Sequence, residues 1–464
     1  MDRRQPVALL SKIERRKQGK ALREKCPRTA LGEWKTRSQS QDPLKLLEQS
    51  NADRIPGLIP LRYERMSESP FKFYRGTAII QARDLANSPV SGIKAQLCGD
   101  CHLMNFGGYA TPERTLVFDI NDLDETFPGP WEWDVKRLGA SLVLAASDRS
   151  FSTHVAADAV RAAATAYREQ MSHFAEESVL GTWYARVTSD DLLDYFRKDE
   201  DFIKRLKTKG AEARSRTSEA AFPKLSEVVN GRRRIKDNPQ VIYHFHENVK
   251  DFEKLQLAFW EGYKKSLQED RRELFERYKW QDGAIKVVGV GSVGTRCYVA
   301  LFLADDDDPL FLQVKEAGRS VLESPNGKSR FAHQGLRVVK GLRLMQASSD
   351  IFLGWGSTPR HNYYVRQLRD MKVAAEPETF KPSTLESYAT MCGWVLARAH
   401  AKAGDAPMIA GYLGSKDTFD EALVKYSAAY ADQAERDFAL FKAAIRSGRL
   451  RTKPDKASGL DFLV

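Results

Sequence analysis

A glycine-rich turn between two β-forming runs constrains this chain more than any other feature. Residues 281–316 read QDGAIKVVGVGSVGTRCYVALFLADDDDPLFLQVKE, with Gly289, Gly291 and Gly294 spaced as G-x-G-x-x-G. A dinucleotide-binding turn of this spacing needs a strand before it, a helix after it and an acid about 20 residues later. Here the run TRCYVALFL follows the last glycine and reads as a strand. The sequence therefore predicts a hairpin, and an antiparallel sheet around it.

The hairpin predicts contacts with nucleotide phosphates. In the phosphate-covering loop of a kinase, glycines let backbone N–H groups approach the phosphates, and we expect this of Gly289, Gly291, Ser292 and Gly294. The next strand carries Lys315 near its end, where a lysine reaches the α- and β-phosphates. The simpler alternative is an ordinary glycine hairpin with a surface lysine.

A second group of polar residues lies far upstream, in CGDCHLMNFG (98–107). Asp100 would orient or deprotonate an attacking hydroxyl group, and Asn105 would help to hold Mg²⁺ against a triphosphate. The spacing G-D-x-H-x-x-N closely resembles the catalytic loop of aminoglycoside- and choline-type kinases. In that resemblance His102 is mainly structural and orients the loop. The alternative is a polar turn whose Asp and Asn cap backbone groups.

The metal site would be completed by the acidic run FDINDLDE (118–125), which follows a short apolar run typical of a buried strand. We assign Asp119 and Asp122 as metal ligands beside Asn105. Asp124 is a close rival, because the sequence does not determine which acid points inward.

The same segment also contains C-x-x-C-H, formed by Cys98, Cys101 and His102. This pattern occurs in covalent haem attachment and, as C-x-x-C, in redox pairs. Haem attachment is matured outside the cytoplasm, and no signal peptide is visible. A zinc site needs further ligands, and the other cysteines are isolated in the sequence. Neither haem nor redox chemistry is the favoured interpretation.

The order of these parts predicts an unusual fold. In a kinase the glycine loop and lysine precede the catalytic loop, whereas here the catalytic-loop pattern comes about 190 residues earlier. The helix expected over 383–404 resembles the long helix that directly precedes a kinase catalytic loop. A circular permutation explains both facts, and permutation is tolerated where termini lie close together at the surface. We therefore expect an α+β, protein-kinase-like two-lobed fold that is circularly permuted.

This fold divides the chain into four segments. They are a basic N-terminal arm over 1–44, a mainly helical large lobe with the catalytic loop over 45–280, a β-rich nucleotide-binding small lobe over 281–370, and a helical segment over 371–464 that completes the large lobe. One kinase element is missing, because the helix expected near 331–347 has no Glu to pair with Lys315. Glu323 or Gln334 would have to substitute.

Charge and composition limit the partners and the compartment. The net charge is +11, and residues 1–37 hold twelve Lys/Arg against four acids. Such an arm could contact nucleic acid or an acidic partner, but a solvated, partly disordered arm is the favoured interpretation. No run approaches 18 apolar residues, and five cysteines make no disulfide framework. We expect no membrane span and a cytoplasmic protein.

Several motifs together resemble the bacterial family named domain of unknown function 2252. The resemblance covers about residues 45–440 and rests on the runs SPFKFYRG, CGDCHLMNFG, FDINDLDE, GPWEWDVKRLGASL, GVGSVGTRCY, YYVRQLRDMK and LARAHAKAGD. The family name brings no reaction. It implies that further residues belong to motifs, namely Arg75, Trp131, Trp133, Asp134, Lys136, Arg137, Arg366 and Gln367. Cys101 replaces the alanine expected there, which further disfavours a haem or redox role.

The expected roles of these residues are mostly structural. Arg75 would form a buried ion pair with an acid of 119–125, with phosphate contact as the alternative. Asp134 would cap its helix or pair with Arg137. His400 would be a core histidine whose hydrogen bonds are satisfied. Arg366 follows the strand that would be the inter-lobe hinge, where backbone groups could meet adenine.

The leading functional hypothesis is an ATP- and Mg²⁺-dependent phosphotransferase. Asp100 would be the base, Lys315 the phosphate contact, and the acceptor an unknown hydroxyl compound or protein bound within 131–280. One alternative is a catalytically weak nucleotide-binding regulatory module. A second is a metal-dependent hydrolase or nuclease that uses the acidic cluster of Asp100 and Asp119, with the basic arm on nucleic acid.

Overall fold

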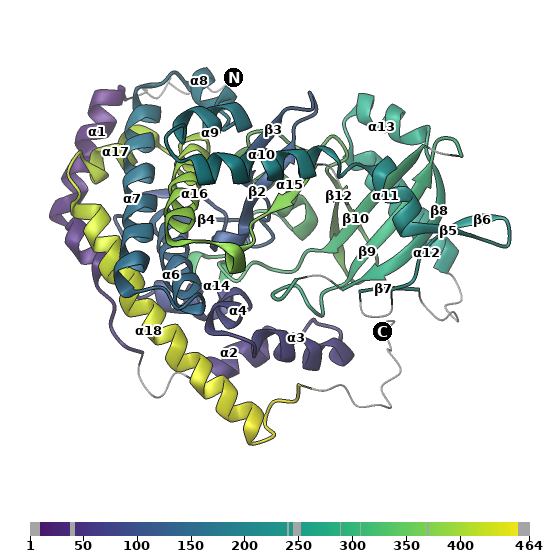
Figure 1. The fold of residues 1–464 in the computed structure, drawn as a ribbon, viewed down its shortest axis with the longest axis horizontal. Helices are drawn as coiled ribbons and strands as arrows, with labels where there is room; N and C mark the ends of the chain where they lie inside the picture. The colour runs from purple at the N-terminus through teal and green to yellow at the C-terminus, as the bar shows by residue number, and fades with distance from the viewer. Residues whose placement is uncertain are drawn as a thin grey trace, which may run out of the picture.

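The computed structural model describes residues 10–37, 42–238, 241–244, 252–287, 289–306, 308–368 and 371–452. It is a mixed α+β structure with two parts side by side (Figure 1). The helical region comprises the described residues of 10–215 and 371–452. The sheet region comprises those of 216–368. Within the described residues, no helix is both long and apolar enough to cross a membrane.

The basic N-terminal segment belongs to the helical region. Helix α1 (Lys12–Ala21) begins with a capping box of Ser11 and Glu14 and packs against α17 (Ala406–Leu413). Arg23 donates to the carbonyl oxygens of Gly411 and Tyr412 at 2.6 and 2.8 Å, near the end of α17. Such bonds satisfy the free carbonyl groups of a helix end. The expectation of a solvated arm is therefore wrong for residues 10–37.

Three long helices form the centre of the helical region. They are α6 (Glu132–Asp148), α7 (Thr153–Glu176) and α16 (Pro382–Ala403), and α16 covers the predicted 383–404. α16 and α7 approach closely because small residues face each other. A Cβ on Gly393 would lie 2.1 Å from the carbonyl oxygen of Ala163. Helix α18 (Thr418–Arg446) crosses the outside of this group (Figure 1).

Short strands support the two candidate site loops. β1 (Lys94–Leu97) pairs with β4 (Phe127–Pro130). β2 (Phe106–Ala110) and β3 (Leu116–Ile120) form a sheet with β13 (Val373–Ala374), in the order β13-β2-β3. Residues 98–105 connect β1 to β2, and residues 121–126 connect β3 to β4. The strand expected at TLVFDI is therefore present.

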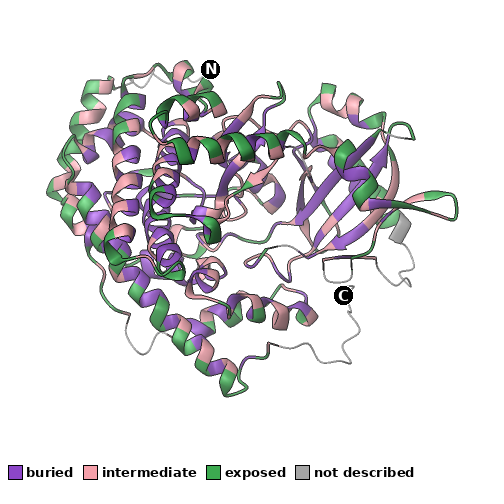
Figure 2. Ribbon diagram, viewed as in Figure 1, coloured by how far each residue is buried: buried purple, intermediate pink, exposed green. Residues whose placement is uncertain are grey.

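The sheet region contains one six-stranded antiparallel sheet, ordered β11-β12-β10-β9-β8-β7. The glycine turn joins β8 (Lys279–Lys286) to β9 (Cys297–Leu303), which confirms the expected hairpin. β10 (Pro309–Glu316) carries Lys315 opposite Tyr364 of β12 (Asn362–Gln367). Helix α15 (Gln334–Met345) lies between β10 and β11 (Gly354–Ser357) in the chain. Figure 2 shows the central strands buried.

The sheet region begins before residue 281. Helices α12 (Phe252–Ser266) and α13 (Glu269–Glu276) place Trp260, Tyr263 and Phe275 in one apolar cluster with Phe302 of β9. Phe222 of α11 (Ser218–Leu225) packs with Phe311 of β10. Helices α11, α12 and α13 therefore pack on the sheet, although the sequence pattern assigned them to the helical lobe.

The remaining elements are short connections or surface helices. They are η1 (Leu22–Glu24), η2 (Arg28–Gly32), α2 (Pro43–Gln49), η3 (Pro56–Leu58), α3 (Ile59–Met66), α4 (Pro70–Arg75), α5 (Ala78–Leu85), η4 (Leu103–Asn105), α8 (Val179–Tyr184), α9 (Ser189–Tyr195), α10 (Glu200–Arg214), β5 (Ser226–Val229), β6 (Arg232–Ile235), β7 (Ile242–Tyr243), α14 (Glu323–Asn326) and η5 (Pro377–Thr379).

Candidate functional site

A cavity of about 930 Å³ lies between the helical and sheet regions. One wall is the glycine turn with residues 316–328. The second is the pair of loops that carry Asp100 and Asp122. The third is formed by α2 to α5. Its lining includes many of the predicted site residues, namely Arg75, Asp100, His102, Asn105, Asp122, Asp124, Gly289, Gly291 and Ser292.

Helix α6 anchors the loop 98–105 through Asp134. The Asp134 carboxylate accepts the backbone N–H groups of Cys98 and Gly99 at 2.6 and 2.9 Å, and it contacts Nε2 of His400 at 3.1 Å. His400 is fully buried, and its Nδ1 contacts the hydroxyl of Tyr167 at 2.8 Å, as expected of a satisfied core histidine. Asp134 therefore neither caps α6 nor pairs with Arg137. Its position inside the first turn of α6 directs the side chain toward the loop instead.

Asp100 is held at the cavity by Arg137 of α6. Nε of Arg137 donates to Oδ1 of Asp100 at 2.6 Å, and the Asp100 side chain stays 21% exposed. Nδ2 of Asn105 donates to the backbone carbonyl of Asp100 at 2.6 Å. Since this bond uses the amide nitrogen of Asn105, its side-chain oxygen is left as a ligand for a cation.

His102 is buried behind Asp100. Its backbone N–H donates to the Asp100 carbonyl at 2.8 Å, and its own carbonyl accepts the N–H of Asn105 at 2.8 Å. Burial lowers the pKa of His102 to about 3, so the imidazole is neutral at physiological pH. The geometry agrees with the predicted structural role of orienting the loop.

Lys315 lies against two carboxylates from the other loop. Its Nζ is 3.1 Å from Asp122 and 2.7 Å from Asp124, and Asp124 also accepts the hydroxyl of Tyr364 at 2.5 Å. Burial disfavours the Asp122 carboxylate, but Lys315 and Arg366 outweigh that effect and hold its pKa below the usual range. Burial and the charge of Asp122 raise the pKa of Asp124. Burial disfavours the Lys315 ammonium, yet the two aspartates hold its pKa above the usual range.

Asp119 is not brought to this cavity. It lies inside β3, paired with Gly107, and its side chain is fully buried. Its carboxylate binds Arg398 of α16 at 2.6 Å, the hydroxyl of Tyr109 at 2.9 Å and the N–H of Ala347 at 2.6 Å. Asp122 and Asp124 follow the end of the strand and face the cavity, which is why they, and not Asp119, contact Lys315.

The glycine turn is docked on the segment 53–76. The N–H of Ile55 donates to the Gly294 carbonyl at 2.8 Å, and Arg65 donates to the Gly289 carbonyl at 2.7 Å. Gly289 and Gly294 have φ of +63° and +90°, which favours glycine there. A Cβ on Gly291 would lie 3.0 Å from the carbonyl oxygen of Arg75. The turn therefore covers one end of the cavity with little side-chain bulk.

Arg366 lies behind the acidic loop rather than in the cavity. It donates to the Asn121 carbonyl at 2.8 Å and to the side chain of Gln313 at 3.4 Å. The described residues that line the cavity include neither Arg366 nor its neighbours in β12. The cavity therefore does not extend to this strand, whose backbone was expected to contact adenine.

Arg75 lies in the cavity without the expected ion pair. Within the described residues it forms no ion pair, and its buried Nε has no hydrogen-bond partner. Its Cζ lies 5.8 Å from the ring centroid of Phe71, and burial lowers its pKa. Asp122 and Asp124, two of the acids of 119–125 expected to pair with Arg75, instead pair with Lys315.

Helix α15 has no glutamate to pair with Lys315, and its polar side chains make other contacts. Helix α15 carries Arg337, which donates to the carbonyls of Asp124 and Thr126 at 2.9 and 2.7 Å. Gln334 bonds Arg337, and Glu323 lines the cavity with its Oε1 on the N–H of Ser329. Neither contacts Lys315 in a hydrogen bond, because Asp122 and Asp124 hold that lysine.

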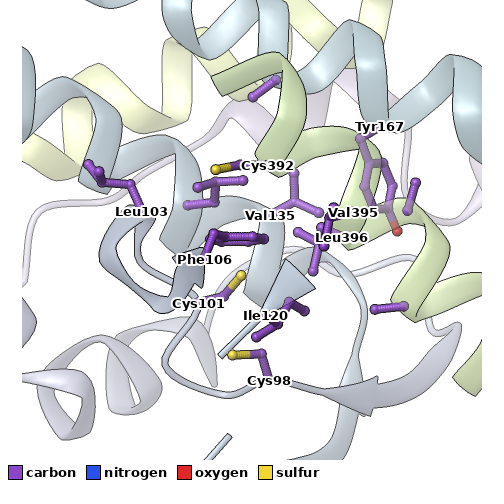
Figure 3. Close-up of a cluster of buried hydrophobic side chains, with 14 of the residues drawn as sticks. Cys98, Cys101, Leu103, Phe106, Ile120, Val135, Tyr167, Cys392, Val395 and Leu396 are labelled. Carbon is purple, nitrogen blue, oxygen red and sulfur yellow. The ribbon is translucent and has the colours of Figure 1, made fainter. Parts of the chain in front are cut away.

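The C-x-x-C-H cysteines are part of the apolar core. Cys98 and Cys101 are fully buried and lie among Ile120, Val135 and other apolar side chains (Figure 3). The pKa of each thiol is raised, and burial is the largest cause for Cys101. A raised pKa disfavours the reactive thiolate. These features do not fit haem attachment or a redox pair.

The donors at the cavity fit Mg²⁺. Among the described residues, no group of three or more His, Cys, Asp or Glu side chains forms a metal cluster. Mg²⁺ is usually bound by one or two carboxylates together with water and phosphate oxygens. Asp122, Asp124 and Asn105 line the cavity and carry side-chain oxygens of this kind, and the two aspartates also contact Lys315.

Sequence reasoning placed only Arg75 of the third wall at the site. The segment 46–83 also contributes Arg54, Arg62 and Arg83 to the lining, whereas no residue of 131–280 does so among those described. The expected acceptor pocket within 131–280 is therefore not at this cavity. The run SPFKFYRG was the available signal, since it places Arg75 at the end of α4.

Comparisons with known proteins give one match. The family model described as "Uncharacterized protein conserved in bacteria (DUF2252)" matches residues 54–444. No curated protein and no solved structure matches the chain.

Proposed function

The chain belongs to the DUF2252 family, and from its cavity we propose that it is an ATP- and Mg²⁺-dependent phosphotransferase acting on a hydroxyl group. The observation that carries the proposal is the meeting of three distant segments around one space. The glycine turn, the Asp100–Asn105 loop, and Asp122 and Asp124 border the cavity, and the buried Lys315 contacts these two aspartates. Lys315 and Asp122 are 193 residues apart in the chain.

The connectivity supports a kinase-like, circularly permuted fold. Along the chain come a glycine-turn hairpin, a strand with a lysine, helix α15 and two more strands. Helix α16 follows, and its Tyr388 hydroxyl donates to the carbonyls of Leu103 and Phe106 at 3.1 and 3.0 Å. This contact supports the permutation, because α16 would be the helix that precedes a kinase catalytic loop, although the loop 98–105 comes first in the chain.

Each residue at the cavity has an assignable task. Asp100, fixed by Arg137, would accept the proton of the acceptor hydroxyl. Lys315 would contact phosphate oxygens from its place on the two aspartates, and the N–H groups of 289–294 would cover the phosphates. Asn105, Asp122 and Asp124 would hold Mg²⁺. When bound, the metal would neutralise the developing charge on the phosphates. Arg75, which forms no ion pair among the described residues, lines the same cavity and would bind a further phosphate oxygen.

The second candidate is a nucleotide-binding module with little catalytic activity. It is favoured by the composition of α15, which contains no glutamate, and by Lys315, which forms ion pairs with Asp122 and Asp124 instead. Nucleotide binding is common to both candidates, and turnover separates them.

Binding is tested by thermal unfolding with ATP and Mg²⁺ for three proteins. At a hundredfold excess over Kd, the wild type should gain about 2.7 kcal/mol. Lys315→Met should bind at least tenfold more weakly. The matched control is Lys340→Met, because Lys340 is exposed on α15 and outside the cavity lining. Absence of stabilisation up to millimolar nucleotide would contradict both candidates.

Chemistry is tested with Asp100→Asn. This variant should keep ATP binding and lose release or transfer of the terminal phosphate by at least about a hundredfold. A wild type that binds ATP without turnover would favour the regulatory module. A metal-dependent hydrolysis that Lys315→Met leaves intact would point to the hydrolase alternative.

A further inference from the structure

A second cavity lies beside β2 and β3, where α9, α10 and α16 contact these strands. Its volume is about 240 Å³, and none of the residues assigned above to phosphotransfer lines it. Most of its walls are apolar side chains, including Leu116, Phe118, Leu192, Phe202, Leu206, Val373 and Met391.

Two glycines leave this space open. Gly108 is in β2 and Gly210 is in α10, and both line the cavity. A Cβ on Gly108 would meet no atom closer than 3.5 Å, and one on Gly210 none closer than 3.7 Å. Neither position therefore requires glycine for packing. Glycine within a helix costs about 1 kcal/mol relative to alanine. The two glycines thus lower local stability at positions where a larger side chain would fill the cavity.

The edge of the cavity has four basic side chains, Arg205, Lys207, Lys209 and Arg214, and two acidic ones, Asp190 and Glu376. Lys207 and Arg214 are exposed, and within the described residues neither forms an ion pair or a side-chain hydrogen bond. Nη1 of Arg214 lies 3.7 Å from the Cβ position of Gly210, so its guanidinium is at the open space. The other basic residues are already paired, since Lys209 bonds Glu376 at 2.7 Å and Arg205 bonds Thr379 at 2.8 Å.

From these features we infer that the cavity binds a small amphiphilic anion, an alkyl or aryl carboxylate. Its apolar body would lie against Leu116, Phe118 and Leu206, where burial of apolar surface provides affinity. Its carboxylate would accept hydrogen bonds from Arg214 and Lys207. A neutral apolar compound would leave both cations unpaired, and a polyanion would not use the apolar walls. The inference does not depend on the proposed phosphotransfer.

Calorimetry with decanoate below its micelle concentration tests the site. The wild type should bind decanoate at least tenfold more tightly than decanol, which has the same chain and no charge. Gly210→Leu should fill the cavity and abolish binding of both compounds, while circular dichroism shows an intact fold. Arg214→Glu should weaken decanoate binding at least tenfold and leave decanol binding unchanged. Lys204→Glu is the matched control, because Lys204 is exposed on α10 outside the cavity lining.

Three results would overturn the inference. They are no binding of millimolar decanoate by the wild type, unchanged binding by a folded Gly210→Leu protein, and equal affinities for decanoate and decanol. A failure of ATP binding would leave these measurements unaffected, because they use no nucleotide.

Discussion

The two sides of the main cavity are held in different ways. The loop 98–105 is fixed by buried bonds from Asp134 and Arg137 of α6 and from Tyr388 of α16. The glycine turn 289–294 is held by backbone and arginine contacts to 53–76, and its Val290 and Val293 are buried in apolar clusters with side chains of that segment, among them Tyr63 and Ile55. The chemistry-bearing side is therefore held rigid by buried hydrogen bonds, whereas the cover is held mainly by apolar packing and backbone contacts. Ordered catalytic groups are what group transfer requires.

The largest expected effect comes from breaking the rigid side. Asp134→Ala removes the acceptor of two buried N–H groups and the partner of His400. Because each unsatisfied buried group costs about 1–3 kcal/mol, we expect a loss of at least about 3 kcal/mol in the free energy of unfolding. Urea denaturation measures it. Asp148→Ala, at the half-exposed end of the same helix, should cost less than about 1 kcal/mol, and equal losses in the two variants would contradict the account.

The pH dependence of unfolding tests the loop 98–105 through its buried residue His102. Burial lowers its pKa to about 3 in the folded protein, so the unfolded chain binds the proton first as the pH falls. The stability that depends on a neutral His102 is therefore fully present above about pH 6.5. It is lost as the pH falls toward 3, by up to about 1.4 kcal/mol of unfolding free energy per pH unit. Free energies of unfolding at pH 7, 6 and 5 should decline less steeply in His102→Gln. His154→Gln, on the exposed side of α7, should decline like the wild type, and identical slopes in all three would refute the assignment.

A smaller effect on stability is expected at the cover. Gly291→Val places its Cβ 3.0 Å from the carbonyl oxygen of Arg75 and would lift the turn. Since the turn need shift by only a few tenths of an ångström to accept the Cβ, we expect about 1 kcal/mol of destabilisation, but about tenfold weaker binding of Mg²⁺ with ATP. Titration calorimetry and urea denaturation give the two values. Gly262→Val, at an open position of α12, should change neither the affinity nor the cavity, and a similar loss of affinity there would count against a specific role of the turn.

Local patterns predicted local structure well. The hairpin at 289–294, the strand at 116–120 and the helix over 383–404 are present because alternation, glycine spacing and amphipathic periodicity act within a few residues. The sequence did not determine which acid faces the cavity. Asp119 and Asp122 are three residues apart, and only the end of β3 and the position of Arg398 on a distant helix decide between them.

The features that the sequence did not predict depend on packing between segments that are far apart in the chain. Arg23 and Arg28 bind carbonyl groups at the end of α17, 389 and 385 residues away in the chain, and charge counting, which does not see such contacts, suggested a solvated arm. The lining arginines of α2 to α5 and the pairing of Arg137 with Asp100 likewise depend on contacts between segments. No spacing rule within one segment encodes them.

The central claim, that nucleotide binds between the glycine turn and the acidic loop, is tested most directly by amide hydrogen exchange with and without Mg²⁺ and a nonhydrolysable ATP analogue. In the free protein the amides of 98–105 should exchange slowly and those of 289–295 quickly. On addition of the analogue, exchange in 289–295 should slow at least tenfold in the wild type and not in Lys315→Met. Unchanged exchange in 289–295 at a saturating analogue concentration would contradict the claim.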